Sequence, residues 1–394
     1  MQGINRRSLA FRYRLDRSIR NLVMKAMNAM TPASSDQGMN FRSEQIKRIL
    51  VVRSLFRMGD AILATPAILL LRDNFPDAQI DFVGSSLSKA LFEKLPIDRH
   101  FEVYRSFPRA SWSYLVLLKK IRETRYDLAF DASGSSAALG SFIVGFSAAR
   151  LRVGVRGKWD RWFNVRLDRP ATKNKYRTLP ELIGSLGLQS RRVYPRLILS
   201  PAEIEQGRSR MRTLIRGNEA PIVGIFVGGR KSRGKRWARE NFLALANRLL
   251  GARAQLVTFV GPEEKELLAY FQQELGGNAR TLFEPDVRAF ASLVAHCNLF
   301  VGCDSGPVHL ACALRVPTVA IFLKNELDHW GPPADLGCII GPEESVSVDA
   351  VFEACVREYS NHRSKAGTGS LCVSPRNKAN AKMPYIESDD YADR

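Results

Sequence analysis

The sequence lacks long hydrophobic runs, since none of its apolar segments reaches the ~18 residues that a membrane-spanning helix needs. The amino terminus also lacks the uninterrupted apolar stretch of a secretory signal. Six cysteines are present, all in the last hundred residues, and no two of them form a Cys-x-x-Cys pair. These absences exclude a zinc site of the usual ligand spacing and argue against a disulfide framework. They predict a protein of a reducing compartment, the cytoplasm.

Acidic residues are scarce relative to basic ones. The chain has 39 Asp and Glu against 59 Lys and Arg, which gives a formal net charge of +20. So basic a surface favours an anionic partner: nucleic acid, an anionic membrane face or a phosphorylated substrate. A merely soluble basic protein is the alternative. Hydrophobic residues make up 45% of the 394 residues, which is typical of a globular chain with room for two domains.

The first 30 residues carry seven bases and one acid. Apolar residues recur there at helical spacing: Leu15, Ile19, Leu22, Val23, Ala26, Met27 and Met30. The pattern predicts a basic amphipathic helix on an anionic membrane surface, with a helix docked on its own domain or a frayed tail as alternatives. Residues 31–45 are predicted to be a linker and residues 361–394 a disordered tail.

Between these ends, apolar strands alternate with helices in two series. Such alternation predicts mostly parallel, doubly wound sheets buried on both faces. We therefore predict two α/β domains that face each other across a cleft, residues 46–200 and residues 201–360. Pro195–Pro201 is the predicted link between them.

The first series opens with the strand Ile49–Arg53, then Met58-Gly59-Asp60 and one predicted helix, Ala61–Asn74. Open α/β sheets bind ligands at the loops that follow their strands. Asp60 is therefore a candidate general base, because a carboxylate within hydrogen-bond reach can deprotonate a hydroxyl group. Its alternative role is a helix N-cap, which requires no function.

A second strand–turn–helix unit reads Cys303-Asp304-Ser305-Gly306-Pro307-Val308-His309. Free N–H groups and the helix dipole at such a turn form an anion site. Gly306 permits close approach of a ligand to the backbone, and Pro307 suits the first helical turn. His309 lies one turn further, where it could reach a phosphate or a ribose. A side chain directed into the core is its alternative.

A basic loop follows the strand Ile222–Val227, with six bases and no acid between Arg230 and Arg239. It suits a diphosphate, with Lys235 supplying charge to a phosphate leaving group; a solvated loop is the alternative. Arg236 stands where a phosphate-binding loop of ATPases requires Ser or Thr, so that class is excluded. Glu263, at a predicted helix start, either binds a ribose hydroxyl or favours the helix dipole.

Together these segments resemble glycosyltransferase family 9, the ADP-heptose:lipopolysaccharide heptosyltransferases. The resemblance covers roughly residues 48–359. It rests on the segments Met58-Gly59-Asp60, Thr65-Pro66-Ala67, Phe75-Pro76-Asp77-Ala78, Ile80-Asp81, Tyr126-Asp127-Leu128-Ala129-Phe130-Asp131, Lys235-Arg236-Trp237 and Cys303–Ala311.

The resemblance implies a GT-B architecture of two Rossmann-like domains, with the acceptor on the first and the nucleotide sugar on the second. It implies an inverting transfer that needs neither a metal nor a cofactor, which agrees with the lack of an Asp-x-Asp cluster. Asp60 would deprotonate the acceptor hydroxyl, and Lys235 would neutralise the leaving diphosphate. The implied donor-binding residues are Lys235, Glu263, Asp304, Ser305, Gly306 and His309.

The implied acceptor is inner-core lipopolysaccharide, an anionic glycan at the inner face of the inner membrane. We expect the protein to be cytoplasmic, peripheral on that membrane and without a nucleic-acid partner. Bases predicted to meet phosphate or Kdo carboxylate groups of the acceptor are Arg57, Arg105 and Arg109, and the basic stretch Arg150–Arg177 could add to them.

Residues 323–332 depart from the family pattern, which has Gly-Pro-Thr after the corresponding strand. That loop would lie near the donor sugar, so another nucleotide sugar is an alternative donor. A sugar-nucleotide epimerase on the same fold, an inactive envelope scaffold and a nucleic-acid-binding protein are the other hypotheses. Charge alone supports the last of these.

Overall fold

The computed structural model describes residues 46–54, 56–104, 109–134, 138–189, 194–215, 220–342 and 346–367. The predicted amphipathic helix and linker lie outside these residues. The described residues contain no helix that is both long and apolar enough to cross a membrane. The final helix continues to Gly367, so the start of the predicted disordered tail is helical.

The first half is built on a sheet of six parallel strands in the order β3-β2-β1-β4-β5-β6. This is the doubly wound order, whose direction switches between β1 and β4. β6 was not predicted, because it is a short strand within the basic stretch and alternates Arg166 with two buried apolar residues. The strands are β1 Arg48–Val52, β2 Gln79–Gly84, β3 Arg99–Glu102, β4 Leu128–Asp131, β5 Leu151–Val155 and β6 Val165–Leu167.

Helices cover this sheet. The prediction of a single helix after β1 is wrong, because two helices follow that strand. Pro66 has no N–H to continue the first helix, and the Thr65 hydroxyl donates instead to the carbonyl oxygen of Ile62 at 2.8 Å. The helices are α2 Met58–Ile62, α3 Thr65–Asn74, α4 Ser86–Leu91, α5 Arg109–Thr124, α6 Ala138–Phe146 and α7 Lys175–Gly184, with a 3-10 turn at Asp160–Trp162.

The second half repeats the architecture with the order β12-β11-β10-β7-β8-β9, again all parallel and switching between β7 and β10. Its strands are β7 Ile222–Phe226, β8 Gln255–Val260, β9 Ala279–Phe283, β10 Leu299–Cys303, β11 Thr318–Ile321 and β12 Cys338–Ile340. Its helices are α8 Pro201–Leu214, α9 Arg239–Gly251, α10 Glu266–Leu275, α11 Val287–Val294, α12 Gly306–Ala313, α13 Leu327–Trp330 and α14 Val348–Gly367, with 3-10 turns at Lys231–Arg233 and Gly276–Asn278.

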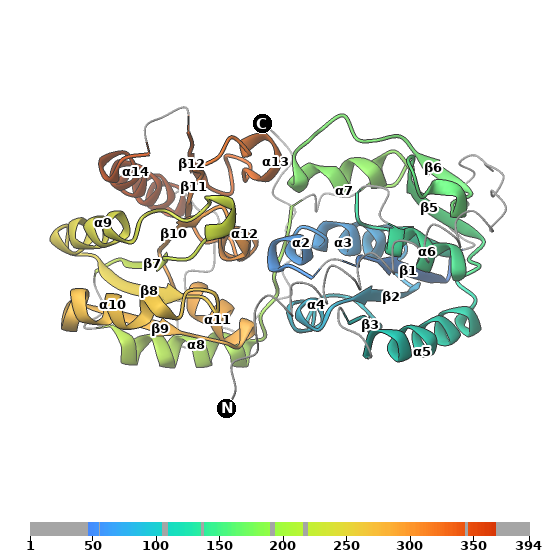
Figure 1. The fold of residues 1–394 in the computed structure, drawn as a ribbon, viewed down its shortest axis with the longest axis horizontal. Coiled ribbons are helices and arrows are strands. Elements are labelled where there is room, and N and C mark those ends of the chain that lie inside the picture. Colours follow the sequence, from blue (N-terminus) through green and yellow to red (C-terminus); the bar gives the residue numbers. More distant parts are fainter. Residues whose placement is uncertain are drawn as a thin grey trace.

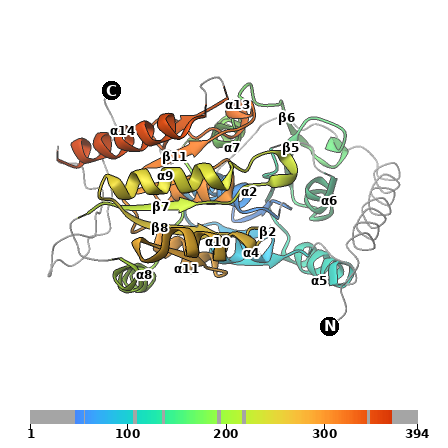
Figure 2. The same cartoon turned by 60° about the vertical axis from the view of Figure 1, so that its left-hand side comes forward.

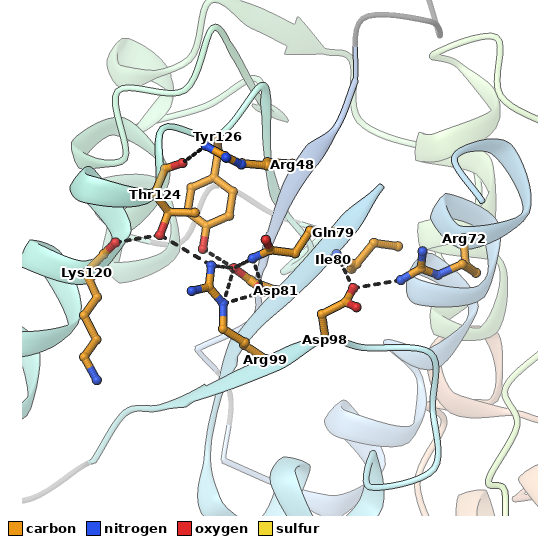
Figure 3. A network of polar contacts seen from close by, with 10 residues as sticks. All are labelled: Arg48, Arg72, Gln79, Ile80, Asp81, Asp98, Arg99, Lys120, Thr124 and Tyr126. Atoms are coloured by element: carbon orange, nitrogen blue, oxygen red, sulfur yellow. Dashed lines mark hydrogen bonds and ion pairs between the residues drawn. The ribbon is translucent and has the colours of Figure 1, made fainter. Parts of the chain in front are cut away.

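Two of the sequence motifs, Ile80-Asp81 and the segment that begins with Tyr126-Asp127, form hydrogen bonds at the amino ends of strands in the first sheet (Figure 3). The fully buried carboxylate of Asp81 accepts hydrogen bonds from the Tyr126 hydroxyl at 2.5 Å and from the Arg99 guanidinium at 2.6 Å. Burial, followed by this hydrogen bond, raises the pKa of Tyr126. Asp127 accepts from the backbone N–H groups of Lys47 and Arg48, both at 2.9 Å. These residues hold the strands together at the edge away from their carboxyl ends.

The two halves lie side by side, with α2 against α12 and α4 against α11, and with α7 near α13 (Figures 1 and 2). Residues 194–200, which have no helix or strand, lead from the first half into α8. Arg288 of α11 is buried at this junction and forms several hydrogen bonds there. Its guanidinium donates to Glu203 at 2.7 Å and to the carbonyl oxygens of Ile198 at 2.9 Å and Ala90 at 3.2 Å.

Candidate functional site

The switch point of the first sheet carries a buried guanidinium beside a carboxylate. Arg53 directly follows β1, is 6% exposed and donates to the carbonyl oxygen of Ala132. Its Nη2 lies 3.8 Å from Oδ1 of Asp60 in α2. The N-cap of α2 is Arg57, so the alternative role of Asp60 as an N-cap is wrong.

Lys175 is a second cation near Asp60, and no sequence motif marks it as a site residue. It begins α7, where burial lowers its pKa; Arg53 acts in the same direction, and Asp60 opposes both. The neighbouring Asn174 caps α7 and donates to the carbonyl oxygen of Gly331 at 2.9 Å, which ties this helix to the second half. A possible signal was the position of Lys175 directly after an Asn cap inside a basic stretch.

Lys235 occupies the switch point of the second sheet. It follows Gly234, whose φ of 64° is the left-handed conformation that glycine tolerates best. Two residues on, Trp237 is buried edge-to-face against Phe242, and its backbone N–H donates to the Cys303 sulfur at 3.3 Å. The Lys-x-Trp spacing therefore anchors the loop in the core and directs Lys235 toward the end of β10.

Lys235 is 9% exposed, and its ammonium lies between two carboxylates. Its Nζ is 2.5 Å from Oδ2 of Asp304, and it also pairs with Glu326. Glu326 belongs to the loop of residues 323–332 that departs from the family pattern. The hydrogen bond from Lys235 lowers the pKa of Glu326. No local pattern in the sequence indicates this contact.

The α12 amino terminus lies beside this ion pair. Ser305 is its N-cap but makes no side-chain cap, since its hydroxyl donates to the carbonyl oxygen of Cys303 at 2.9 Å. His309, one turn on, is buried. Its Nδ1 is 2.6 Å from the Tyr176 hydroxyl, and its Nε2 is 3.9 Å from Oδ1 of Asp304. Burial lowers the pKa of His309, so its imidazole is neutral at pH 7.

Two glycines allow the motifs of the two halves to meet at the contact between α2 and α12. A Cβ atom on Gly59 would lie 2.7 Å from Cδ2 of His309, and one on Gly306 would lie 2.7 Å from Cβ of Met58. Real Cβ atoms do not approach so closely, so a side chain at either position would push the halves apart. The structure thus brings together the two strand–turn–helix units that the sequence singled out.

The other predicted site residues lie further out. Glu263 is exposed, and α10 begins at Glu266 rather than at Glu263. Its neighbour Glu264 is buried instead and accepts from the N–H of Gly229 at 3.2 Å. Arg57 is exposed. Arg105 lies outside the described residues, and the Arg109 side chain does as well.

A crevice of about 500 Å³ lies between the segment around the start of α7 and the segment around α13. Lys173 and Arg177 line it from the first half, and Asp328 lines it from the second. It adjoins Lys175 through Asn174. Among the described residues, no three His, Cys, Asp or Glu side chains are grouped so as to hold a metal ion.

Known proteins resemble this chain over most of its length. The family model of glycosyltransferase family 9 (heptosyltransferase) matches residues 114–355. Lipooligosaccharide heptosyltransferase 2 of Campylobacter jejuni is 25% identical over 284 residues, which cover 70% of this chain and 81% of that protein. Lipopolysaccharide heptosyltransferase 2 of Salmonella typhimurium is 24% identical over 305 residues, covering 72% and 85%.

Solved structures share the fold. A glycosyl transferase family 9 protein from Veillonella parvula superposes with a TM-score of 0.71 at 20% identity, over 80% of this chain and 97% of that one. The E. coli ADP-heptose lps heptosyltransferase II superposes with a TM-score of 0.66 at 21% identity, over 81% and 100%. The predicted GT-B fold of two doubly wound α/β units is confirmed. Because the family model matches more than half of its residues, the chain belongs to glycosyltransferase family 9 and is a glycosyltransferase.

Proposed function

We propose that the protein transfers heptose from ADP-heptose to the inner core of lipopolysaccharide, inverting the anomeric carbon and using no metal ion. The observation that carries this proposal is the α2–α12 contact, where Asp60 of one half and Lys235 of the other flank the same junction. The named activities of the Campylobacter jejuni and Salmonella typhimurium relatives support heptose as the sugar and lipopolysaccharide as the acceptor.

Asp60 is the proposed general base. Its carboxylate takes the proton of an acceptor hydroxyl, and that oxygen forms a bond to the anomeric carbon of the donor as the bond to the β-phosphate oxygen breaks. A single displacement of this kind inverts the anomeric centre. The guanidinium of Arg53, 3.8 Å from this carboxylate, and the nearby Lys175 place positive charge beside it.

The second half stabilises the leaving ADP. Lys235 and the positive end of the α12 dipole supply positive charge where the diphosphate gains negative charge. A buried ammonium and a helix dipole thus do the work that a divalent metal does in other transferases, which supports the metal-independent reaction. Ser305 and Gly306 are proposed to contact phosphate, and Asp304, His309 and Glu263 to contact ribose or adenosine.

The acceptor side is basic. Arg57, Arg105 and Arg109 are proposed to bind the anionic groups of lipopolysaccharide. The net charge of +20 supports association with the inner face of the inner membrane, aided by the amphipathic helix predicted before residue 31.

A different nucleotide sugar is the second candidate donor. The observation that favours it is Glu326, which belongs to the divergent loop and contacts Lys235 directly. A carboxylate there changes the hydrogen bonds offered to the donor.

The test is transfer by the purified protein from ADP-heptose to truncated lipopolysaccharide acceptors, read by mass. We expect a heptose-sized mass gain that is lost in Asp60→Asn and kept in Asp77→Asn, an exposed acid on the same half. Consumption of another nucleotide sugar alone would correct the donor. A sugar of changed stereochemistry formed without acceptor would indicate an epimerase, and no turnover of any nucleotide sugar would contradict the proposal.

A further inference from the structure

The imidazole of His309 is enclosed by residues from both halves of the molecule. Between ring centroids, it lies 5.5 Å from Tyr176 of α7 and 6.2 Å from Trp330 of α13. On the side of α2 it lies against Gly59, where a Cβ atom would approach the imidazole to 2.7 Å. His309 is 3% exposed, so packing at the junction of the halves restricts the orientation of its ring.

The two nitrogen atoms of this ring differ in their partners. Nδ1 is 2.6 Å from the Tyr176 hydroxyl, and this contact joins α7 of the first half to α12 of the second. Nε2 forms no hydrogen bond to any residue that the structure describes, and Oδ1 of Asp304 is too distant at 3.9 Å. A polar atom left unpaired on a buried side chain is costly, which favours a ligand as its partner.

The direction of the hydrogen bond at Nδ1 decides what Nε2 can offer a ligand. Because burial lowers the pKa of His309, its neutral ring carries a single N–H proton at pH 7. If the Tyr176 hydroxyl donates to Nδ1, the proton is on Nε2, and Nε2 is a hydrogen-bond donor. If Nδ1 donates to the hydroxyl oxygen, Nε2 is an acceptor.

Two neighbours favour the first arrangement. The thiol of Cys312 also interacts with the Tyr176 hydroxyl, and burial raises the pKa of Cys312 to about 11, so the thiol is neutral. Thiol sulfur accepts hydrogen bonds weakly, and the imidazole nitrogen is therefore the better acceptor for the hydroxyl proton. On the opposite side of the ring, the negative charge of Asp304 attracts a proton on Nε2.

We propose that Tyr176 is a positioning residue of the donor site: its hydroxyl donates to Nδ1 of His309 and holds the proton on Nε2, which then donates to an oxygen atom of the bound nucleotide. The proposal rests on the donor site of the proposed function. Tyr176 belongs to the half that carries the proposed base, so one half completes a hydrogen-bond donor of the other.

The tautomer matters because every exposed oxygen of a diphosphate is an acceptor. With the proton on Nε2, His309 adds a neutral donor beside the ammonium of Lys235 without adding another charge to the pair of Lys235 and Asp304. With the proton on Nδ1, a lone pair would face the phosphate oxygen, and two acceptors repel each other. The Tyr176 hydroxyl thus decides whether this ring attracts or repels the nucleotide.

The first experiment needs no ligand. In protein with ¹⁵N-labelled histidine at pH 7, the signals of His309 are assigned among the five histidines by their loss in His309→Gln. We expect Nδ1 to give the signal of an unprotonated nitrogen and Nε2 that of a protonated one. Tyr176→Phe should shift the Nδ1 signal toward that of a nitrogen without a hydrogen bond. The reverse assignment of the two nitrogens would overturn the proposal.

Tyr194→Phe is the matched control. Tyr194 packs against the same apolar cluster as Tyr176, and its hydroxyl interacts with Asp335. Its loss removes a hydroxyl group from the junction and should leave both nitrogen signals of His309 in place.

The second experiment is calorimetric titration with ADP in a double-mutant cycle. Tyr176→Phe should weaken ADP binding about five- to tenfold, which is the usual effect of one hydrogen bond. His309→Gln keeps an N–H donor but has no ring tautomer, so Tyr176→Phe should change binding less than about twofold in that background. An equal loss in both backgrounds would show that Tyr176 acts only through packing, and an unchanged affinity in Tyr176→Phe would equally overturn the proposal.

The two experiments separate this proposal from the proposed function. Failure of the unchanged protein to bind ADP would contradict the proposed function. A reversed pattern of nitrogen signals with intact ADP binding would contradict only the role of Tyr176. If Tyr176→Phe does not fold, the nitrogen signals of the unchanged protein still decide between the two tautomers.

Discussion

The two sheets have the same strand order but opposite chemistry at their switch points. In the first, a buried arginine lies 3.8 Å from the carboxylate of the proposed base, Asp60. In the second, two carboxylates flank one buried lysine beside a helix amino terminus. The shared fold supplies only the position, at the carboxyl ends of adjacent strands. In the proposed reaction, the residues that follow β1 and β7 decide which half deprotonates the nucleophile and which half stabilises the leaving group.

Removal of the Lys235 charge should have the largest effect on the proposed division of roles between the two halves. We expect Lys235→Met to lower kcat by roughly 10²–10³-fold, which is the usual cost of losing one group that stabilises transition-state charge. Initial transfer rates at saturating donor would measure it. Lys231→Met changes an exposed base of the same loop and is the control. A loss of less than tenfold specific to Lys235 would show that the α12 amino terminus suffices for the leaving group.

The second prediction concerns Arg288, at the junction of the halves. Arg288→Met removes the guanidinium that pairs with the Glu203 carboxylate and should lower the free energy of unfolding by about 3 kcal/mol. Thermal unfolding would measure this loss. Arg208→Met is the control, since Arg208 pairs with Glu205 on the surface of α8. An unchanged melting temperature in Arg288→Met would mean that the halves are held together by the α2–α12 contact instead.

The Arg288–Glu203 pair also predicts that stability depends on pH. The hydrogen bond from Arg288 lowers the pKa of Glu203 to about 2, below its value in the unfolded chain. The stabilisation is therefore complete above the unfolded pKa of about 4.5 and is lost as the pH falls toward 2. The melting temperature of Glu203→Gln should accordingly approach that of the unchanged protein as the pH falls through this window. A constant difference between the two would show that the ion pair is not responsible.

Most of the fold was predictable, and the exceptions have physical causes. Continuous apolar runs such as the predicted strand Ile222–Val227 mark strands buried on both faces, and β7 spans Ile222–Phe226. The short strand β12 and the helix α13 were missed because three or four residues carry no periodicity. The helix α8 was missed because it buries only Gly207 and Met211 against α11.

The site was predictable in part. Asp60, Lys235, Asp304 and His309 follow strands, and the topology brings them to the carboxyl ends of the two sheets. Their roles remain predictions. The contacts of Lys175 and Glu326 could not be foreseen, because each depends on how loops far apart in the sequence pack across the junction. Local sequence patterns show which face of a helix or strand is buried. They do not show which residues of the other half that element contacts.

A smaller change would test the junction between the halves. In Gly59→Ala the added methyl must displace His309, which should lower the free energy of unfolding by roughly 1–3 kcal/mol. Heptose transfer should fall with it, because Asp60 moves relative to Lys235. Gly251→Ala is the control, since no atom lies within 4 Å of the added group. Unaltered stability and transfer in Gly59→Ala would show that α2 and α12 have room to separate without consequence.

The smallest expected effect concerns Glu326, which pairs with the ammonium of Lys235. If ADP binds Lys235 as proposed, it must displace this carboxylate or bring two negative groups together. Because the Glu326 side chain is 37% exposed, the pair is screened by water, and we expect Glu326→Gln to tighten ADP binding only about two- to fivefold. Calorimetric titration with ADP would measure it, with Asp328→Asn, an exposed acid of the same loop, as the control. Weaker binding in Glu326→Gln would show that this carboxylate contacts the nucleotide directly, and the lysine of the second half would then have one competing carboxylate, Asp304, rather than two.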